Sequence, residues 1–166
     1  MLLDDILRES ASREPGKIAL ICDGRRFTYR EIDERADRLA NALIHHGVRR
    51  GDRVGIHLGN SIEAVIGLFA VVRAGGVFVL ISQTVKSDKL AFMLNHCHAV
   101  GLLEQVSGSA QSEEAVLGIK ERVKSLKFLI AVQKPGAVRR QAAEDWLAFE
   151  DLLKVFPATP VPGIGI

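Results

Sequence analysis

The chain lacks an excess of charge of either sign. Its 166 residues hold 22 Lys and Arg against 20 Asp and Glu, which leaves a net charge of +2. Proteins that attract nucleic acid or an anionic membrane through their overall field carry a far larger positive excess. The basic pairs are scattered and are interpreted as solvated turn residues: Arg25-Arg26, Arg49-Arg50 and Arg139-Arg140. We therefore expect no nucleic acid among the partners.

Cysteine is scarce as well, and no signal peptide is recognisable in the sequence. Cys22 and Cys97 lie far apart in apolar settings, which predicts two reduced, buried thiols rather than a disulfide. A signal peptide needs an uninterrupted apolar segment near the N-terminus. Charged residues interrupt that region here: Asp4, Asp5, Arg8 and Glu9. Both observations predict a cytoplasmic protein.

No uninterrupted apolar run is long enough to span a membrane. Residues 64–72 and 74–81 are apolar and are separated only by Arg73, so together they approach the roughly 20 residues that a spanning helix needs. However, Arg73 would lie at the centre of that helix, where a charge is most costly, and Gly75-Gly76 would break it. A buried helix followed by a buried strand explains the same residues, and we expect no membrane span.

The first 50 residues contain strong local signals. Residues 2–7 predict a short amphipathic helix that Pro15-Gly16 ends, and strands 18–22 and 26–28 flank Asp23-Gly24, which indicates a β-hairpin. Thr28 then caps a helix, and Glu31 completes a capping box. Gly47 suits the left-handed position after that helix. Its expected apolar stripe is Ile32, Ala36, Leu39, Ala40, Leu43 and Ile44.

The remainder alternates strands with helices, which predicts a mostly parallel sheet with helices beside it. The expected strands are 53–58, 77–81, 100–103 and 128–132, and the expected helices are 62–73, 86–95, 113–124 and 146–155. Asn60 or Ser61 would cap the helix 62–73. The run 77–81 is of the type buried on both faces of a sheet. Residues 134–143 are predicted to be a loop.

Two motifs and their spacing resemble a known family. The first motif is Phe27-Thr28-Tyr29-Arg30-Glu31-Ile32, the second is Arg73-Ala74-Gly75-Gly76-Val77-Phe78-Val79, and GVRRGDRV and GNSIEA lie between them. Together they resemble the opening region of the AMP-forming adenylating enzymes, the acyl-CoA synthetase and adenylation-domain superfamily. The resemblance continues more loosely to about Glu104. It implies a partial N-terminal domain of such an enzyme over residues 1–155. Residues 156–166, which hold three of the prolines, are expected to be a linker or a truncated end.

The sequence departs from the family after the second motif. The family continues from that strand with Pro, then Asn and often a second Pro, whereas this chain has Leu80, Ser82 and Gln83. Without the prolines the turn loses a restraint on φ and should be looser by up to about 1 kcal/mol. Drift in an unselected copy would produce the same change.

The family's phosphate-binding loop is not recognisable in this chain. Such a loop presents backbone N–H groups to phosphate and ends in a Lys. Gly118-Ile119-Lys120 lacks the upstream glycine, and Gly163-Ile164-Gly165 has no helix after it. ATP, Mg²⁺ and coenzyme A are cofactors that the resemblance implies for a full-length member. We expect no cofactor-binding, metal-binding or catalytic residue in this chain.

The remaining candidate residues have ordinary structural explanations. Residues 96–98 read His-Cys-His, but adjacent residues point in different directions and cannot converge on a metal without an irregular loop. His45-His46 is interpreted as favouring a helix dipole. His57 is interpreted as a packed residue, since no motif places an acid or nucleophile near it. Ser107-Gly108-Ser109 lacks both the pattern and the strand-turn-helix context of a nucleophile elbow.

The resemblance therefore predicts the N-terminal part of an ATP-dependent acid–thiol ligase of the acyl-CoA synthetase type, acting on a carboxylic or fatty acid. By itself the chain is expected to be inactive, and its expected partner is the missing C-terminal portion or a second copy. Three alternatives stay open: a non-catalytic binding module, a decayed remnant, and one half of a split ligase. A flavodoxin-like nucleotide binder is disfavoured, because no strand leads into a phosphate-cradling loop.

Overall fold

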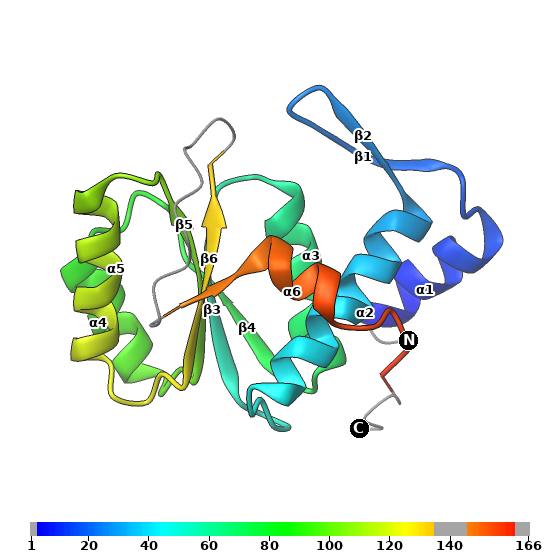
Figure 1. The fold of residues 1–166 in the computed structure, drawn as a ribbon. Coiled ribbons are helices and arrows are strands. Elements are labelled where there is room, and N and C mark those ends of the chain that lie inside the picture. The colour runs from blue at the N-terminus through cyan, green and yellow to red at the C-terminus, as the bar shows by residue number, and fades with distance from the viewer. Residues whose placement is uncertain (1–2, 135–145, 162–166) are drawn as a thin grey trace.

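The helices and strands follow the predicted alternation closely. The computed structural model describes residues 3–134 and 146–161, and the shape of the fold is shown in Figure 1. The elements are α1 (Leu3–Arg13), β1 (Ile18–Cys22), β2 (Arg25–Thr28), α2 (Tyr29–His45), β3 (Arg53–His57), α3 (Ile62–Arg73), β4 (Val77–Leu80), α4 (Ser87–His96), β5 (Gly101–Val106), α5 (Ala110–Arg122), β6 (Phe128–Gln133), β7 (Leu147–Ala148) and α6 (Phe149–Val155).

Five strands form a parallel sheet in the order β4-β3-β5-β6-β7, and β1 and β2 form a separate antiparallel hairpin. The predicted α/β fold class, with an N-terminal helix and hairpin before a parallel sheet, is confirmed. Asp23 and Gly24 have φ values of 50° and 72°. Two consecutive positive φ angles are what a tight two-residue hairpin turn requires.

Helices cover both faces of the sheet (Figure 1). Helices α2, α3 and α6 share one apolar core with the face that carries Val54, Ile56 and Leu103. Helices α4 and α5 share a second core with the opposite face, which carries Leu102 and Leu129. Strands β5 and β6 therefore bury side chains on both faces, as continuous apolar strands of parallel sheets do.

The prediction that residues 77–81 are buried on both faces was wrong. Strand β4 lies at the edge of the sheet and pairs only with β3. Val77 is 50% exposed and Leu80 is 59% exposed, while Phe78 and Val79 are half-buried. An edge strand has a neighbour on one side only, and strand order, which the local sequence does not encode, puts β4 there. Of these two apolar segments, β4 thus exposes large side chains, whereas every residue of α3 is buried or half-buried.

The capping box at the start of α2 is confirmed. The Thr28 side chain accepts a hydrogen bond from the backbone N–H of Glu31, and the Glu31 carboxylate accepts one from the backbone N–H of Thr28 at 2.8 Å. Ser61, and not Asn60, caps α3, with its hydroxyl accepting from the backbone N–H of Ala64. Gly47 has a φ of 92° after α2, as predicted. Ile44, which was assigned to the apolar stripe, is 40% exposed near the end of the helix.

A buried arginine joins the first three helices. The Arg73 side chain is 1% exposed, and its guanidinium lies 2.6 Å from Asp4 of α1, 2.5 Å from Asp33 of α2 and 3.0 Å from Asp37 of α2. Arg8 also pairs with Asp37 at 2.9 Å. A guanidinium has five N–H donors in a rigid fork, so one side chain can satisfy several carboxylates where helices meet. The apolar run 64–72 therefore ends in a residue that ties its helix to two others.

The helix predicted over residues 146–155 differs from the structure in one respect. Residues 147–148 form the short strand β7 before helix α6, whereas a single helix was expected over 146–155. Residues 156–161 pack along α2: the Arg38 guanidinium donates to the carbonyl of Phe156 at 2.8 Å, and the Asn41 amide donates to the carbonyl of Thr159 at 2.9 Å. The predicted loop at 134–143 lies almost wholly outside the described residues.

Candidate functional site

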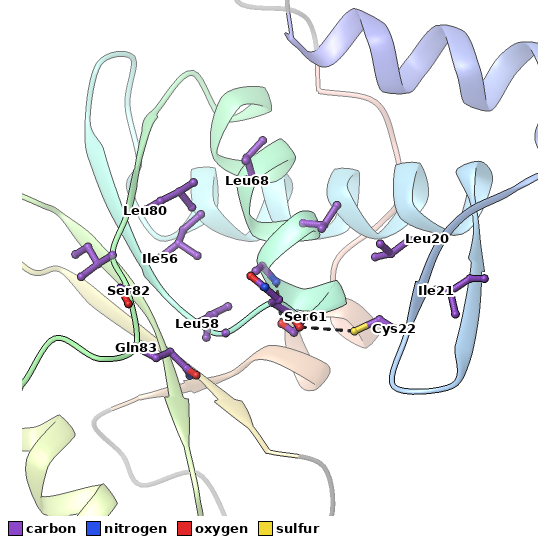
Figure 2. A pocket seen from close by; sticks show the side chains of 15 residues that line it. Leu20, Ile21, Cys22, Ile56, Leu58, Ser61, Leu68, Leu80, Ser82 and Gln83 are labelled. Atoms are coloured by element: carbon purple, nitrogen blue, oxygen red, sulfur yellow. Dashed lines mark hydrogen bonds between the residues drawn. The ribbon is translucent and has the colours of Figure 1, made fainter.

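An apolar groove lies between the hairpin, α3 and the exposed edge of the sheet. Its volume is about 760 Å³, within the range of ligand pockets in general. Figure 2 shows the side chains that line it. One wall comes from the hairpin and another from α3, strands β3 and β4 supply the third side, and polar residues lie at one end; the lining is Leu20, Ile21, Cys22, Ile56, Leu58, Gly59, Asn60, Ser61, Ala64, Val65, Leu68, Leu80, Ile81, Ser82 and Gln83.

Polar residues close the groove at the carboxyl ends of the strands. The loop after β4 crosses this edge, and the side-chain amide of Gln83 is hydrogen-bonded to that of Gln105, which lies on β5. The Gln83 side chain also lies against Gly59, where an added Cβ would come within 2.8 Å of Gln83 Oε1. Since the carboxyl edge of an open parallel sheet is where such folds bind ligands, this end of the groove is the candidate site.

A second hollow of about 370 Å³ lies at the same edge and shares Asn60, Ser61 and Gln83 with the groove. Its other lining residues include Gln105, Gln133 and Lys134. The lining also includes four charged side chains, which are Asp23, Arg25, Glu63 and Lys134. Neither hollow brings together a nucleophile, a base and an acid in the arrangement that covalent catalysis requires.

His57 and Glu104 form a buried pair beneath the loop. His57 is 7% exposed and Glu104 is 8% exposed, and His57 Nδ1 lies 2.7 Å from Glu104 Oε2. His57 Nε2 lies 3.1 Å from the carbonyl oxygen of Ser82. Burial opposes the charged ring, but the hydrogen bond and the negative charge of Glu104 outweigh it and raise the pKa of His57. Burial also raises the pKa of Glu104, with His57 opposing.

His57 is packed, as predicted, and an acid that no motif indicated, Glu104, lies beside it. Glu104 faces it because β3 and β5 are neighbours in the sheet, with His57 directly opposite Glu104 in the register. The two residues stand far apart in the sequence, so no local motif could reveal the pair. The one available signal was a charged residue inside an otherwise apolar strand, since a buried carboxylate needs a partner.

The other histidine and cysteine candidates are placed at helix ends and in turns. His96 ends α4, Cys97 follows as its C-cap, and His98 has a φ of 49°. Within residues 3–134 and 146–161, no group of three His, Cys, Asp or Glu side chains could hold a metal ion. His45 and His46 lie at the end of α2, as predicted, but burial lowers the pKa of His46, so a positive charge there is disfavoured.

Both cysteines are free, and neither is fully buried, so the expectation of buried thiols was wrong. Cys22 lines the groove, with its Sγ 3.8 Å from the carbonyl oxygen of Asn60 (Figure 2). Burial raises the pKa of the Cys22 thiol, with a further contribution from the charge of Asp23. A thiol with a raised pKa is a poor nucleophile at neutral pH.

Ser107 and Ser109 lie in a turn between a strand and a helix, which the sequence did not lead us to expect. β5 ends at Val106, and Ser109 caps α5 by accepting a hydrogen bond from the backbone N–H of Ser112 at 3.2 Å. The two serine hydroxyls lie 3.1 Å apart. The expectation of a different context was wrong, but the cap gives Ser109 a structural role. Gly118-Ile119-Lys120 lies within α5.

No described helix is long and apolar enough to cross a membrane.

These features define an α/β domain whose groove opens at the carboxyl edge of a parallel sheet. The family model for AMP-binding enzymes matches residues 7–161. The chain belongs to this family, and the resemblance seen in its two motifs is confirmed.

Curated relatives match over part of their length. Triostin synthetase I from Streptomyces triostinicus is 42% identical over 98 residues, which cover 59% of this chain and 19% of that protein. A medium/long-chain fatty-acid and 3-oxocholest-4-en-26-oate CoA ligase from Mycobacterium marinum is 28% identical over 129 residues, or 78% of this chain and 23% of that protein. The chain thus matches about a fifth of the length of either relative.

Solved structures give the same result for the fold. The structure of MbtA from Mycobacterium smegmatis superposes with a TM-score of 0.83 at 28% identity, covering 100% of this chain and 29% of that one. The anthranilate CoA ligase AuaEII, in complex with anthranoyl-AMP, superposes with a TM-score of 0.82 at 25% identity, covering 96% of this chain and 29% of that one. The described fold is therefore that of the N-terminal region of adenylating enzymes.

Proposed function

We propose that this chain is the N-terminal part of an ATP-dependent acid–thiol ligase of the acyl-CoA synthetase type. Such an enzyme would join a carboxylic acid to AMP and transfer the acyl group to a thiol. The observation that carries the proposal is a family match over residues 7–161 in a chain that covers only 29% of a solved relative. The chain would act in the cytoplasm, which its free thiols favour.

The described residues would serve as scaffold and as one wall of a binding site. They contain no group suited to a metal ion, and no Gly-rich loop that ends in a Lys before a helix. The arrangement thus does not fit ATP·Mg²⁺ by itself, and we assign no nucleotide contact and no reaction step to these residues. A longer polypeptide or a second chain would supply them.

Carboxylate-dependent ATP–pyrophosphate exchange tests the proposal. The purified chain of 166 residues should give only the blank rate. The same chain extended by the sequence encoded downstream, or mixed with a separately encoded remainder, should give exchange that depends on a carboxylic acid. Exchange by the isolated chain above the blank rate would contradict the proposal that these residues are inactive without the remainder of the ligase. The absence of any downstream Ser/Thr/Gly-rich loop ending in Lys would contradict the ligase assignment.

The alternative is a non-catalytic interaction module, either a decayed remnant or a protein with a separate use. The exposed Val77 and Leu80 on edge strand β4 favour a surface that a partner covers. The partner would be the remainder of the ligase or a second copy of this chain. A module of this kind would self-associate or bind a partner while the exchange assay stays blank in every combination.

A further inference from the structure

We infer that His57 and Glu104 act together as a proton-dependent latch that holds the loop after β4 across the candidate site. The loop comprises residues 82–86, and its first two residues line the polar end of the groove. The inference goes beyond the proposed ligase role and does not depend on it. It rests on which atoms must carry hydrogen.

The carbonyl oxygen of Ser82 fixes the state of one ring nitrogen. A carbonyl only accepts hydrogen bonds, so His57 Nε2, 3.1 Å away, must carry a hydrogen and donate it. The same carbonyl accepts from the backbone N–H of Val85 at 2.9 Å, which closes the loop on itself. The Ser82 carbonyl oxygen thus receives two donors, and of these two only the His57 ring belongs to the sheet.

The other ring nitrogen shares a second proton with Glu104. At 2.7 Å, His57 Nδ1 and Glu104 Oε2 need one hydrogen between them, carried either by an imidazolium or by a carboxylic acid. Both forms leave Nε2 protonated and the latch closed. The buried pair therefore holds two protons in total while the loop is attached.

Loss of one proton breaks the latch. A neutral ring beside an ionised Glu104 has one N–H, and the carboxylate, as a charged acceptor, binds it more strongly than a carbonyl does. The hydrogen then moves to Nδ1, and the bare Nε2 faces the Ser82 carbonyl as a second acceptor. The attraction becomes a repulsion, and the loop loses its attachment to β3.

The direction of the pH effect follows from the raised pKa of His57. Its ordinary value is 6.5, so the stabilisation is fully present below pH 6.5 and is lost as the pH rises through the higher folded value. The burial that raises the pKa of Glu104 favours the same retention of protons. Within the part of the chain that the structure describes, His57 is the one charged group that shifts the pKa of Glu104. Other charged groups on the covering helices, or directly before them, are Lys86, Asp88, Lys89, Glu114, Glu121 and Arg122, all exposed, and Glu113 and Lys120, which are half-buried and engaged in contacts.

The latch stands in the turn where the resemblance leads one to expect prolines and the chain has Leu80, Ser82 and Gln83. Side-chain contacts restrain the turn there instead: His57 binds the Ser82 carbonyl, and Gln105 binds Gln83. A restraint made by a titratable side chain can be released, whereas a proline ring cannot. The width of the groove at this end would thus depend on pH.

Two NMR measurements on the whole chain test the latch between pH 6 and 9. The ring of His57 should titrate above pH 6.5. Hydrogen exchange at the backbone amide of Val85, corrected for the intrinsic base-catalysed rate, should become about tenfold faster as His57 loses that proton. This factor corresponds to the loss of one hydrogen bond of about 1.4 kcal/mol. Exchange at Val85 without such a step, or a His57 pKa below 6.5, would overturn the inference.

Two variants and a control separate the latch from a purely structural role. In Glu104→Gln the amide donates to Nδ1, so Nε2 keeps its hydrogen, the His57 pKa falls, and exchange at Val85 becomes independent of pH. His57→Phe should release the loop at every pH, with circular dichroism reporting that the chain is folded. His96→Gln, at the end of α4, should leave the step unchanged. A step that persists in Glu104→Gln would exclude the shared proton even if His57→Phe fails to fold.

Discussion

Replacement of Arg73 by Met tests whether the buried arginine stabilises the packing of the first three helices. Met retains much of the apolar stem but removes the guanidinium, so Asp4, Asp33 and Asp37 lose their common partner. Asp37 is 3% exposed, and among the described residues it would keep Arg8 as its only ion-pair partner. Removing one member of a buried ion pair typically costs about 3–5 kcal/mol, because the remaining charge is left desolvated.

That loss is a large part of the total stability of an ordinary domain, which is about 5–15 kcal/mol. For a chain of this size we expect the midpoint of thermal unfolding to fall by about 6–20 °C. Urea unfolding followed by circular dichroism gives the change in free energy directly, provided that the slope with denaturant is unchanged.

The matched control is Arg122→Met. Arg122 pairs with Asp88 at a similar distance of 2.6 Å, but the two side chains are 42% and 94% exposed. Exposed pairs contribute about 0–1 kcal/mol, so this variant should unfold almost like the parent. Equal losses in the two variants, or a loss below about 1 kcal/mol for Arg73→Met, would show that burial does not decide the contribution of these pairs.

Three further predictions concern packing, association and ligands. Gly101→Ala would place a Cβ on the ring of Phe128 and should lower the free energy of unfolding by about 1–3 kcal/mol. Gly118→Ala, whose Cβ would have nothing within 4 Å, should raise the free energy of unfolding by about 0.5–1 kcal/mol through helix α5. Urea unfolding compares the two variants. Sedimentation at high concentration should show self-association that Leu80→Lys abolishes and Val155→Lys on α6 does not, and a parent chain that stays monomeric without binding a hydrophobic dye would contradict this. Millimolar ATP·Mg²⁺ should leave the melting temperature unchanged, since binding at 100 times the Kd would add about 2.7 kcal/mol and raise it by several degrees.

The local elements were predictable because their signals lie within a few residues. The capping box of Thr28 and Glu31, the turn at Asp23-Gly24 and the left-handed Gly47 each depend on neighbours in the sequence. The alternation of strands and helices likewise follows from local periodicity. These parts of the fold were confirmed with bounds that shift by only a few residues.

The features that depend on strand order were not predictable in the same way. Val77 and Leu80 read as core residues, and only the position of β4 at the edge exposes them. The contact between His57 and Glu104 requires that β3 and β5 become neighbours, although β4 lies between them in the sequence. The groove depends on how the hairpin stands against α3, which no pattern in either segment specifies.

The attachment of residues 156–161 to α2 has a consequence for the order of synthesis. Arg38 and Asn41 lie early in the chain, yet their backbone partners Phe156, Pro157 and Thr159 are among the last described residues to be made. Val161, at the end of that segment, is only 9% exposed and belongs to the same core as α2. A nascent chain can form the hairpin, α2 and the first strands early, but one side of α2 stays uncovered until the segment arrives. One of the first helices to form, α2, is thus among the last to be fully covered. A chain stalled before residue 156 would leave α2 accessible to chaperones and proteases.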